Sequence, residues 1–500
     1  MKRILTIVLL IGLYLISSCK KEIIYEIVNQ DGLTIFTKQK EGNIGDVMPF
    51  YHDNEWYLFY LHDSPPKPGF HPWYMLSTKN FYEFKDYQEI IPVVHDLESQ
   101  ELALGTGSVI EKDGIFYAFY TAHNGRLLPK EMFMLSISND NMISWEKQDF
   151  IIDPRTYGFN INDFRDPHVV YIPERNLYYM LFTTRYAGKG AIGYLISDDL
   201  INWEKENDGI FFINNHETGT SSIDSNLECP TLWYFNGYWY LTFSEQWPLR
   251  VTRYLYKKNF SDDWIKPNVD TFDGAGLYAG KVGYSEEKMI LAGWVSHNFN
   301  RPNEFGWGGN LIAHELKQSP NGTLFVNIIS TINEKFNHPQ PLTIEDTNLN
   351  NQHNSKITFT QNNFFDYISF NELDDISIIK GNLNITNING SFGIFFDYRE
   401  NASSFYYDFD IKNNTVSFYK GNFKDKDNLC YTHNHFYNTS SNLEFVLLFE
   451  EATDSDGSIV SLYLQDQMVL TGRMPHYRNV NFGFYSNDSD ITITNLKKYK

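Results

Sequence analysis

Cysteine, positive charge and long apolar runs are all scarce in this sequence. Only 3 of the 500 residues are cysteines, and Cys229 and Cys430 lie far apart, so a disulfide framework is not expected. The 41 Lys and Arg against 62 Asp and Glu give a net charge of −21, which excludes the broad basic surface that nucleic acids require. A neutral oligosaccharide or polysaccharide is compatible with this charge, and the oligomeric state stays open.

No motif predicts a bound metal or cofactor. Cys and His residues do not cluster with zinc spacing, and no acidic loop has the EF-hand spacing. No glycine-rich turn follows a strand and opens a helix, as a nucleotide site requires. The sequence therefore predicts a protein that works without either.

The one apolar run of note is at the N-terminus. Residues 4–16 follow Lys2 and Arg3, are too few to span a membrane, and lead to Cys19. This arrangement resembles a bacterial lipobox, in which the cysteine is lipidated and becomes the mature N-terminus. It predicts a signal peptide over 1–19 and an exported protein held at a membrane by acyl chains alone. An ordinary signal peptide with an incidental cysteine is the alternative.

Aromatic residues, by contrast, are abundant. The chain has 34 Tyr, 39 Phe and 10 Trp, and these residues favour strands. Long helical periodicity is absent, whereas Asp113-Gly114 and Asn236-Gly237 are typical of tight hairpin turns. These features predict an all-β protein.

Five degenerate repeats occupy residues 42–329. Each has a polar or acidic motif, a strand, a tight turn and an aromatic strand, and the motifs begin at 45, 105, 165, 228 and 276. Repeats of this length with about four strands each predict a five-bladed β-propeller, which we expect over 20–335. A propeller brings the first strand of every blade to one axis. A large sandwich or a solenoid is the competing architecture.

The composition changes near residue 348. Asn-rich stretches then separate short aromatic strands, the last two at 480–487 and 491–500, with turn signals every several residues. This pattern predicts a β-sandwich over 345–500.

Three of the repeat motifs carry an acid: Asp46, Asp166 and Glu228. On a common axis, two aspartates and a glutamate suit glycosidic bond cleavage, which needs one carboxylate to attack and one carboxylic acid to protonate the leaving oxygen. Each acid also has a plainer interpretation. Asp46 is a candidate turn former, with Asp53 and Asp63 as nearby rivals; the other two are candidate structural partners of basic groups.

Several motifs together resemble those of glycoside hydrolase family 32, the β-fructosidases, in order and in blade position. The motifs are HPWYMLSTKNFYEF at 71–84, GTGSVI at 105–110, RDP at 165–167, ECP at 228–230 and GLYAG at 276–280. The resemblance implies a β-fructofuranosidase of the levanase, inulinase or invertase type that acts by a retaining double displacement. In it, Asp46 is the nucleophile, Glu228 the general acid and base, and Asp166 the stabiliser of the transition state.

A shell of substrate-binding residues is expected around these acids. Arg165 is a candidate to hold a carboxylate or contact the sugar, and Trp73 and Trp294 are candidate sugar platforms, with core packing as the alternative for both rings. Ser108 and Tyr278 are candidates for hydroxyl contacts. The loops at 62–72 and 297–306 are expected at the mouth of the pocket.

The first motif departs from the family pattern. The family has W-M-N-D-P-N-G, whereas this chain has GDVMP at 45–49, which keeps the aspartate and loses its Trp and Asn neighbours. This predicts a divergent member that acts on a different fructan linkage or another furanoside. An arabinofuranosidase-like enzyme and a fructosyltransferase are the enzymatic alternatives, and a glycan-binding lipoprotein without catalysis is the alternative of another class.

Overall fold

The computed structural model describes residues 25–28, 33–63, 69–297, 306–350, 356–361, 365–397, 404–410, 413–421, 429–430, 434–435, 442–452, 456–474 and 479–500. The predicted signal peptide and Cys19 lie outside these residues. Within them, no helix has the length and apolar character needed to cross a membrane.

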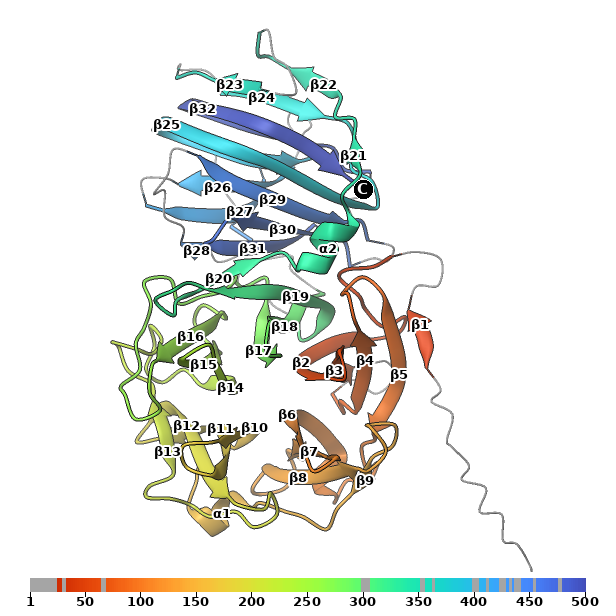
Figure 1. The fold of residues 1–500 in the computed structure, drawn as a ribbon, viewed down its shortest axis with the longest axis vertical. Coiled ribbons are helices and arrows are strands. Elements are labelled where there is room, and N and C mark those ends of the chain that lie inside the picture. Colours follow the sequence, from red (N-terminus) through yellow and green to blue (C-terminus); the bar gives the residue numbers. More distant parts are fainter. Residues whose placement is uncertain are drawn as a thin grey trace, which may run out of the picture.

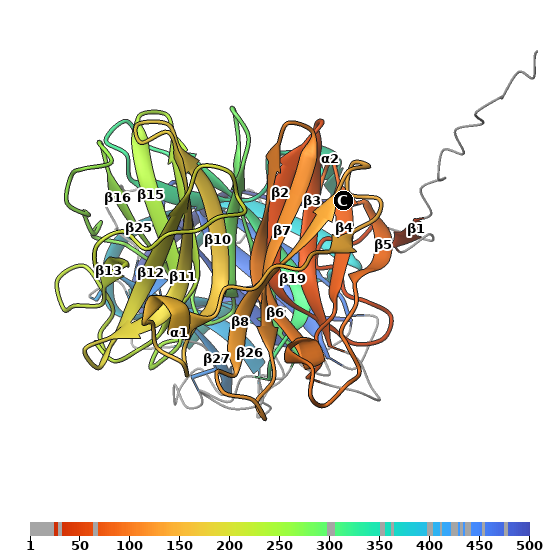
Figure 2. The ribbon, with the colours of Figure 1, turned by 90° about the horizontal axis from the view of Figure 1, so that it is seen from below.

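Five small antiparallel blades stand around a common axis and form the predicted propeller (Figure 1), and strand pairing between the first and last blades joins these two into one nine-stranded sheet. The strands of these blades run roughly parallel to the axis of the ring (Figure 2). Blade 1 contains β2 (Asn43–His52), β3 (Glu55–Asp63), β4 (Trp73–Thr78) and β5 (Phe84–Ile91), with β1 (Glu26–Val28) at its edge. Blade 2 contains β6 (Ala103–Lys112), β7 (Ile115–His123), β8 (Glu131–Ser138) and β9 (Glu146–Lys147).

The remaining blades complete the ring. Blade 3 contains β10 (Arg165–Ile172), β11 (Leu177–Tyr186), β12 (Lys189–Ser197) and β13 (Ile210–Ile213). Blade 4 contains β14 (Leu227–Phe235), β15 (Tyr238–Glu245) and β16 (Thr252–Lys257). Blade 5 contains β17 (Tyr278–Tyr284), β18 (Met289–Ser296), β19 (Gly309–Gln318) and β20 (Leu324–Asn327). Three short helical segments lie between strands: η1 (Gln100–Leu102), α1 (Pro154–Tyr157) and α2 (Ser330–Lys335).

Blade 4 departs from the predicted four strands. After β16, only isolated bridges continue the sheet, Tyr256 with Ile265 and Arg253 with Thr271. Pro267 lies between the two bridges, and proline cannot donate to a strand ladder. The predicted hairpin turns are confirmed: Asp113 and Gly114 both have positive φ, as do Asn236 and Gly237, which is the type I′ signature.

The same irregularity recurs in all five innermost strands, β2, β6, β10, β14 and β17. In each, the pairing register with the second strand slips by one residue, between Gly45 and Met48 in β2 and at the matching place in the others. Two residues of the inner strand therefore face one residue of its partner, which is a β-bulge. The first bulged residues are Asp46, Gly105, Asp166, Cys229 and Ala279.

The C-terminal region forms a second all-β body above the ring in Figure 1, as predicted. Its longest strand, β25 (Ile376–Phe396), pairs along one edge with β32 (Phe482–Tyr499), and its other edge divides between β29 (Leu443–Glu450) and β26 (Ser404–Asp410). The two last predicted strands are thus one continuous strand, β32. The other strands are β21 (Pro339–Gln340), β22 (Ile344–Thr347), β23 (Lys356–Phe359), β24 (Phe365–Phe370), β27 (Thr415–Gly421), β28 (Asn434–His435), β30 (Ser458–Leu464) and β31 (Met468–Met474).

Polar contacts join the two bodies. The Glu450 carboxylate accepts hydrogen bonds from Ile35 N at 2.8 Å, Phe36 N at 2.7 Å and the Thr34 hydroxyl at 2.8 Å, just before blade 1. His314 of β19 is fully buried and hydrogen-bonds the Tyr463 hydroxyl at 2.9 Å. One apolar core runs from blades 1, 4 and 5 into the sandwich, so the two bodies share buried surface.

Candidate active site

The bulges bring the three predicted acids to one place. Asp46 and Asp166 are the first bulged residues of β2 and β10, with φ of 42° and 63°, in the left-handed region where aspartate is tolerated. Glu228 occupies the position directly before the bulge of β14. Arg165 and Tyr278 hold that same position in β10 and β17, on either side of blade 4.

Asp46 is held by one donor on each carboxylate oxygen. Thr106 donates its hydroxyl to Oδ2 at 2.7 Å, and the Trp294 indole N–H donates to Oδ1 at 2.9 Å. Thr106 is the second bulged residue of β6, and Trp294 is paired with Tyr278 across blade 5. The nucleophile candidate of blade 1 is therefore oriented by blades 2 and 5.

Asp166 is more deeply buried, with 4% of its surface exposed. Its Oδ2 accepts from the Thr183 hydroxyl at 3.0 Å and from Cys229 N at 2.9 Å, while its own backbone N–H donates to the Thr121 hydroxyl at 2.9 Å. The carboxylate is thus fixed between blades 3 and 4.

Glu228 lies in a chain of hydrogen bonds between neighbouring blades. Arg165 donates from Nε at 3.2 Å and from Nη2 at 2.9 Å to one carboxylate oxygen. The Tyr278 hydroxyl donates to the other oxygen. Arg165 also contacts Asp163 at 3.0 Å and Glu131 at 3.7 Å, so this single cation neutralises several acids.

Burial dominates the electrostatics of the site. It raises the pKa of Asp46 to about 6; the Thr106 and Trp294 hydrogen bonds oppose the rise, and the charges of Asp166 and Glu228 add to it. Burial also raises the pKa of Asp166, against the opposing charge of Arg165. The charges of the three carboxylates thus act on one another.

Two further cations lie near the acids. Lys281, directly after the bulge of β17, is 2% exposed and donates to Pro230 O at 2.8 Å. Burial lowers its pKa, while the charges of Asp166 and Asp46 favour its protonated form. The Arg250 guanidinium lies 4.4 Å from the centre of the Tyr278 ring.

The predicted binding shell is partly wrong. Trp73 is completely buried and donates its indole N–H to Gly105 O at 3.0 Å, so it supports blade 2 and cannot stack on a sugar. Ser108 is also buried, and its hydroxyl accepts from Val169 N at 2.9 Å, which ties blade 2 to blade 3. Trp294 is only 1% exposed and orients Asp46 without presenting a platform.

Sequence reasoning missed Thr106, Thr183 and Trp307. Thr106 lies inside the GTGSVI motif and Thr183 pairs with Arg165 across blade 3, and their roles follow from the bulge register, which is visible only once the strands are paired. Trp307 has no such signal. Its ring stacks on His71, with centroids 4.1 Å apart and planes at 16°, and burial lowers the pKa of that histidine to about 4. Residues 64–68 and 298–305 of the predicted mouth loops lie outside the described residues.

Trp307 also packs on the backbone beside Asp46. A Cβ atom added to Gly45 would lie 2.3 Å from Trp307 Cη2, so any side chain at this position displaces the indole. The ring thus occupies the space next to the candidate nucleophile.

Glycoside cleavage uses a pair of carboxyl groups, and this centre holds three, one of which is hydrogen-bonded to a phenol and a cation. Fold and site together therefore have the arrangement of a glycosidase. The family model described as "Glycosyl hydrolases family 32 N-terminal domain" matches residues 44–320. This match covers more than half of the chain, so the chain belongs to glycosyl hydrolase family 32.

Individual relatives are distant. A sucrose-6-phosphate hydrolase of Vibrio alginolyticus is 26% identical over 220 residues, and the match spans 43% of this chain and 42% of that relative. The chain therefore matches less than half the length of this curated relative.

Solved structures share the fold over almost the whole chain. An exo-inulinase from Aspergillus awamori has a TM-score of 0.68 at 13% identity, with 93% of this chain and 97% of that chain covered. A Bombyx mori β-fructofuranosidase in complex with sucrose gives 0.65 at 16% identity, with 93% of each chain covered. Fructan 1-exohydrolase IIa from Cichorium intybus in complex with 1-kestose gives 0.66 at 12%, with 94% and 96% covered.

The packing of Trp307 on Gly45 predicts a coupled pair of substitutions. Gly45→Ala should lower the free energy of unfolding by about 1–3 kcal/mol, because the indole must move. In Gly45→Ala/Trp307→Ala the clash is gone, so the loss should be clearly smaller than the sum of the single losses. Urea denaturation measures all three. Gly125→Ala is the control, since its added Cβ meets nothing closer than 3.8 Å; strict additivity would contradict the contact.

Proposed function

We propose that this protein hydrolyses β-fructofuranosyl linkages in sucrose-like sugars or fructans. The observation that carries the proposal is the convergence of Asp46, Asp166 and Glu228 on one axis of a family 32 chain, with Glu228 joined to Arg165 and Tyr278. The names of the similar proteins, an exo-inulinase, a β-fructofuranosidase and a fructan exohydrolase, support the choice of a fructosyl substrate.

The reaction proceeds by double displacement. An Asp46 oxygen attacks the anomeric carbon of the fructosyl unit while Glu228 gives its proton to the leaving oxygen, so one C–O bond forms as the glycosidic C–O bond breaks. Glu228, now a carboxylate, takes a proton from water. The water oxygen attacks the same carbon as the ester bond between that carbon and Asp46 breaks, which releases fructose and returns Asp46 as a carboxylate and Glu228 as an acid.

Neighbouring residues support these steps. Asp166 is the stabiliser of the positively charged transition state, held ready by Thr183 and Cys229 N. Arg165 and Tyr278 fix the orientation of Glu228 from both sides. The donors from Thr106 and Trp294 favour the ionised form of Asp46 that attacks.

The test is a panel of levan, inulin, sucrose and arabinan, with released sugars read by chromatography. Glu228→Gln should lower kcat/KM by about 10²–10⁴-fold, as loss of a general acid does, and Asp46→Asn should abolish turnover with the fold intact. Fructose from the parent protein, lost in both variants, is the expected result. Turnover at the parent rate by Asp46→Asn would exclude the double displacement, and binding without turnover by the parent protein would favour a glycan-binding role.

The raised pKa of Asp46 predicts that the reaction slows at acidic pH. The carboxylate is ionised and nucleophilic above about pH 6, so kcat/KM should fall as the pH drops below that value. Thr106→Val removes a donor that lowers this pKa, so the acidic limb of the pH–rate profile should move to higher pH. Thr242→Val, a buried threonine whose hydroxyl has no hydrogen-bond partner in the described part of the chain, is the control. If the acidic limb of the pH–rate profile stays at the same pH in Thr106→Val, Asp46 is not the group whose ionisation produces it.

One observation favours a second candidate, a divergent member specific for another furanoside. Trp307 covers Gly45, where the family pattern has a polar neighbour of the nucleophile. The Trp307 ring occupies this place instead of a polar side chain that could hydrogen-bond the bound sugar. Discrimination between sugars depends on such hydrogen bonds. Release of arabinose and no fructose in the same panel would establish this candidate.

The N-terminal motif supports a further proposal, that the protein is an exported lipoprotein. The apolar run and Cys19 carry it. In a bacterial host, the parent protein should sediment with membranes and dissolve in detergent, whereas Cys19→Ala should lose the anchor. Equal partition of the two proteins between membrane and soluble fractions would exclude lipidation of Cys19.

A further inference from the structure

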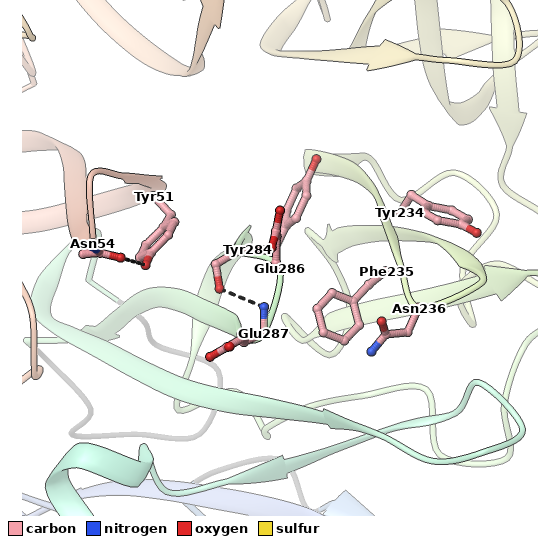
Figure 3. Close-up of a pocket in the computed structure, with 9 residues that line it drawn as sticks. Tyr51, Asn54, Tyr234, Phe235, Asn236, Tyr284, Glu286 and Glu287 are labelled. Atoms are coloured by element: carbon pink, nitrogen blue, oxygen red, sulfur yellow. Dashed lines mark hydrogen bonds between the residues drawn. The ribbon is translucent and has the colours of Figure 1, made fainter.

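A hollow of about 790 Å³ opens at the end of the propeller away from the carboxylates. Its lining comes from the β2–β3, β14–β15 and β17–β18 hairpins, with Tyr284 and Glu286 lying between Tyr51 and Phe235 (Figure 3). Tyr51 and Tyr284 are each five residues beyond the first bulged residue of their strand, Asp46 and Ala279. At about 3.3 Å per strand residue, the hollow is therefore about 17 Å from the catalytic carboxylates.

The tyrosines of the hollow are a repeated feature of the blades. Tyr234 follows its bulged residue in β14 by the same five positions, so each of the three blades that line the hollow places a phenol at the same level along the ring axis. Tyr234 is 47% exposed and Tyr284 is 40% exposed, whereas Tyr51 packs against Trp56 with ring centroids 4.8 Å apart. A tyrosine ring that packs against the protein along one edge and is exposed to solvent along the other can contact the C–H face of a sugar.

The polar lining determines which ligand class fits. The hairpin turns supply the amides of Asn54 and Asn236, and the turn of blade 5 supplies the carboxylates of Glu286 and Glu287. No Lys, Arg or His is among the described residues that line the hollow, so an anionic ligand has no counter-charge there. Amides and phenols both donate to and accept from hydroxyl groups, and carboxylates accept from them, so a neutral polyhydroxylated chain matches this set.

We propose that this hollow is a second, non-catalytic site that binds a neutral saccharide chain. The kind of chain rests on the proposed function, and a fructan is the expected occupant. The site is at the opposite end of the ring from the carboxylates, so it does not position the scissile bond. It holds the protein on a polymer and thereby raises the concentration of chain ends near the active site.

The test uses the full chain with Glu228→Gln, so that binding is measured without turnover. Native gel electrophoresis through gels containing levan, inulin or arabinan gives an apparent affinity for each polymer. Adding Tyr284→Ala should weaken that affinity about two- to tenfold, the effect of one aromatic contact, whereas Tyr284→Phe, which keeps the ring, should retain most of it. Tyr171→Ala is the matched control: Tyr171 is also 40% exposed, follows Asp166 by five residues, and lies outside the hollow.

Each outcome decides the proposal. A loss in Tyr284→Ala, with Tyr171→Ala and Tyr284→Phe close to the parent, supports it. Equal migration of Tyr284→Ala and its parent, or a parent that none of the three polymers retards, overturns it. The result is independent of catalysis, because a protein that binds through Tyr284 and releases no fructose in the substrate panel refutes the proposed function and leaves this site standing.

Discussion

The extra residue in every innermost strand is the constraint on which the site depends. A regular strand would send alternate side chains to the two faces of its blade, where neighbouring sheets pack. The bulge rotates the backbone locally, and Asp46 and Asp166 take left-handed conformations that aim their carboxylates at the axis. Because the bulge falls at the same register in all five blades, Arg165, Glu228 and Tyr278 also meet at one level.

Bringing these carboxylates together is electrostatically unfavourable, and contacts from the surrounding blades offset this. Three carboxylates in a buried centre repel one another, and burial disfavours the charged form of each. Arg165 and Lys281 supply opposite charge at the centre, and Thr106, Thr183 and the backbone of Cys229 supply hydrogen bonds. Asp46 and Glu228 are held by residues of neighbouring blades, and Asp166 by its own blade together with blade 4, so the site exists only in the closed ring.

Much of this arrangement could be predicted from the sequence. The repeat spacing predicted five blades and located Asp46, Asp166 and Glu228, because turn dipeptides and aromatic alternation are local signals. The bulges were not predictable, since their signal is a one-residue slip visible only when strands pair. Trp73 and Ser108 were assigned wrongly for the same reason: which face of a blade is buried depends on the neighbouring blade. Trp307 contacts Gly45 across more than 260 positions of sequence, which no local pattern records.

The contact between Glu450 and residues 34–36 has a consequence for how the chain is made. The segment that leads into blade 1 receives its buried hydrogen-bond acceptor from a strand more than 400 positions later. Among the described residues, the seam between blades 1 and 5 has one strand-to-strand bridge, Ile44 with Gly309, besides the side-chain contacts of Trp294 and Trp307. Closure of the ring at this seam is therefore supported by a strand that is synthesised long after blade 5, which couples assembly of the active centre to folding of the sandwich.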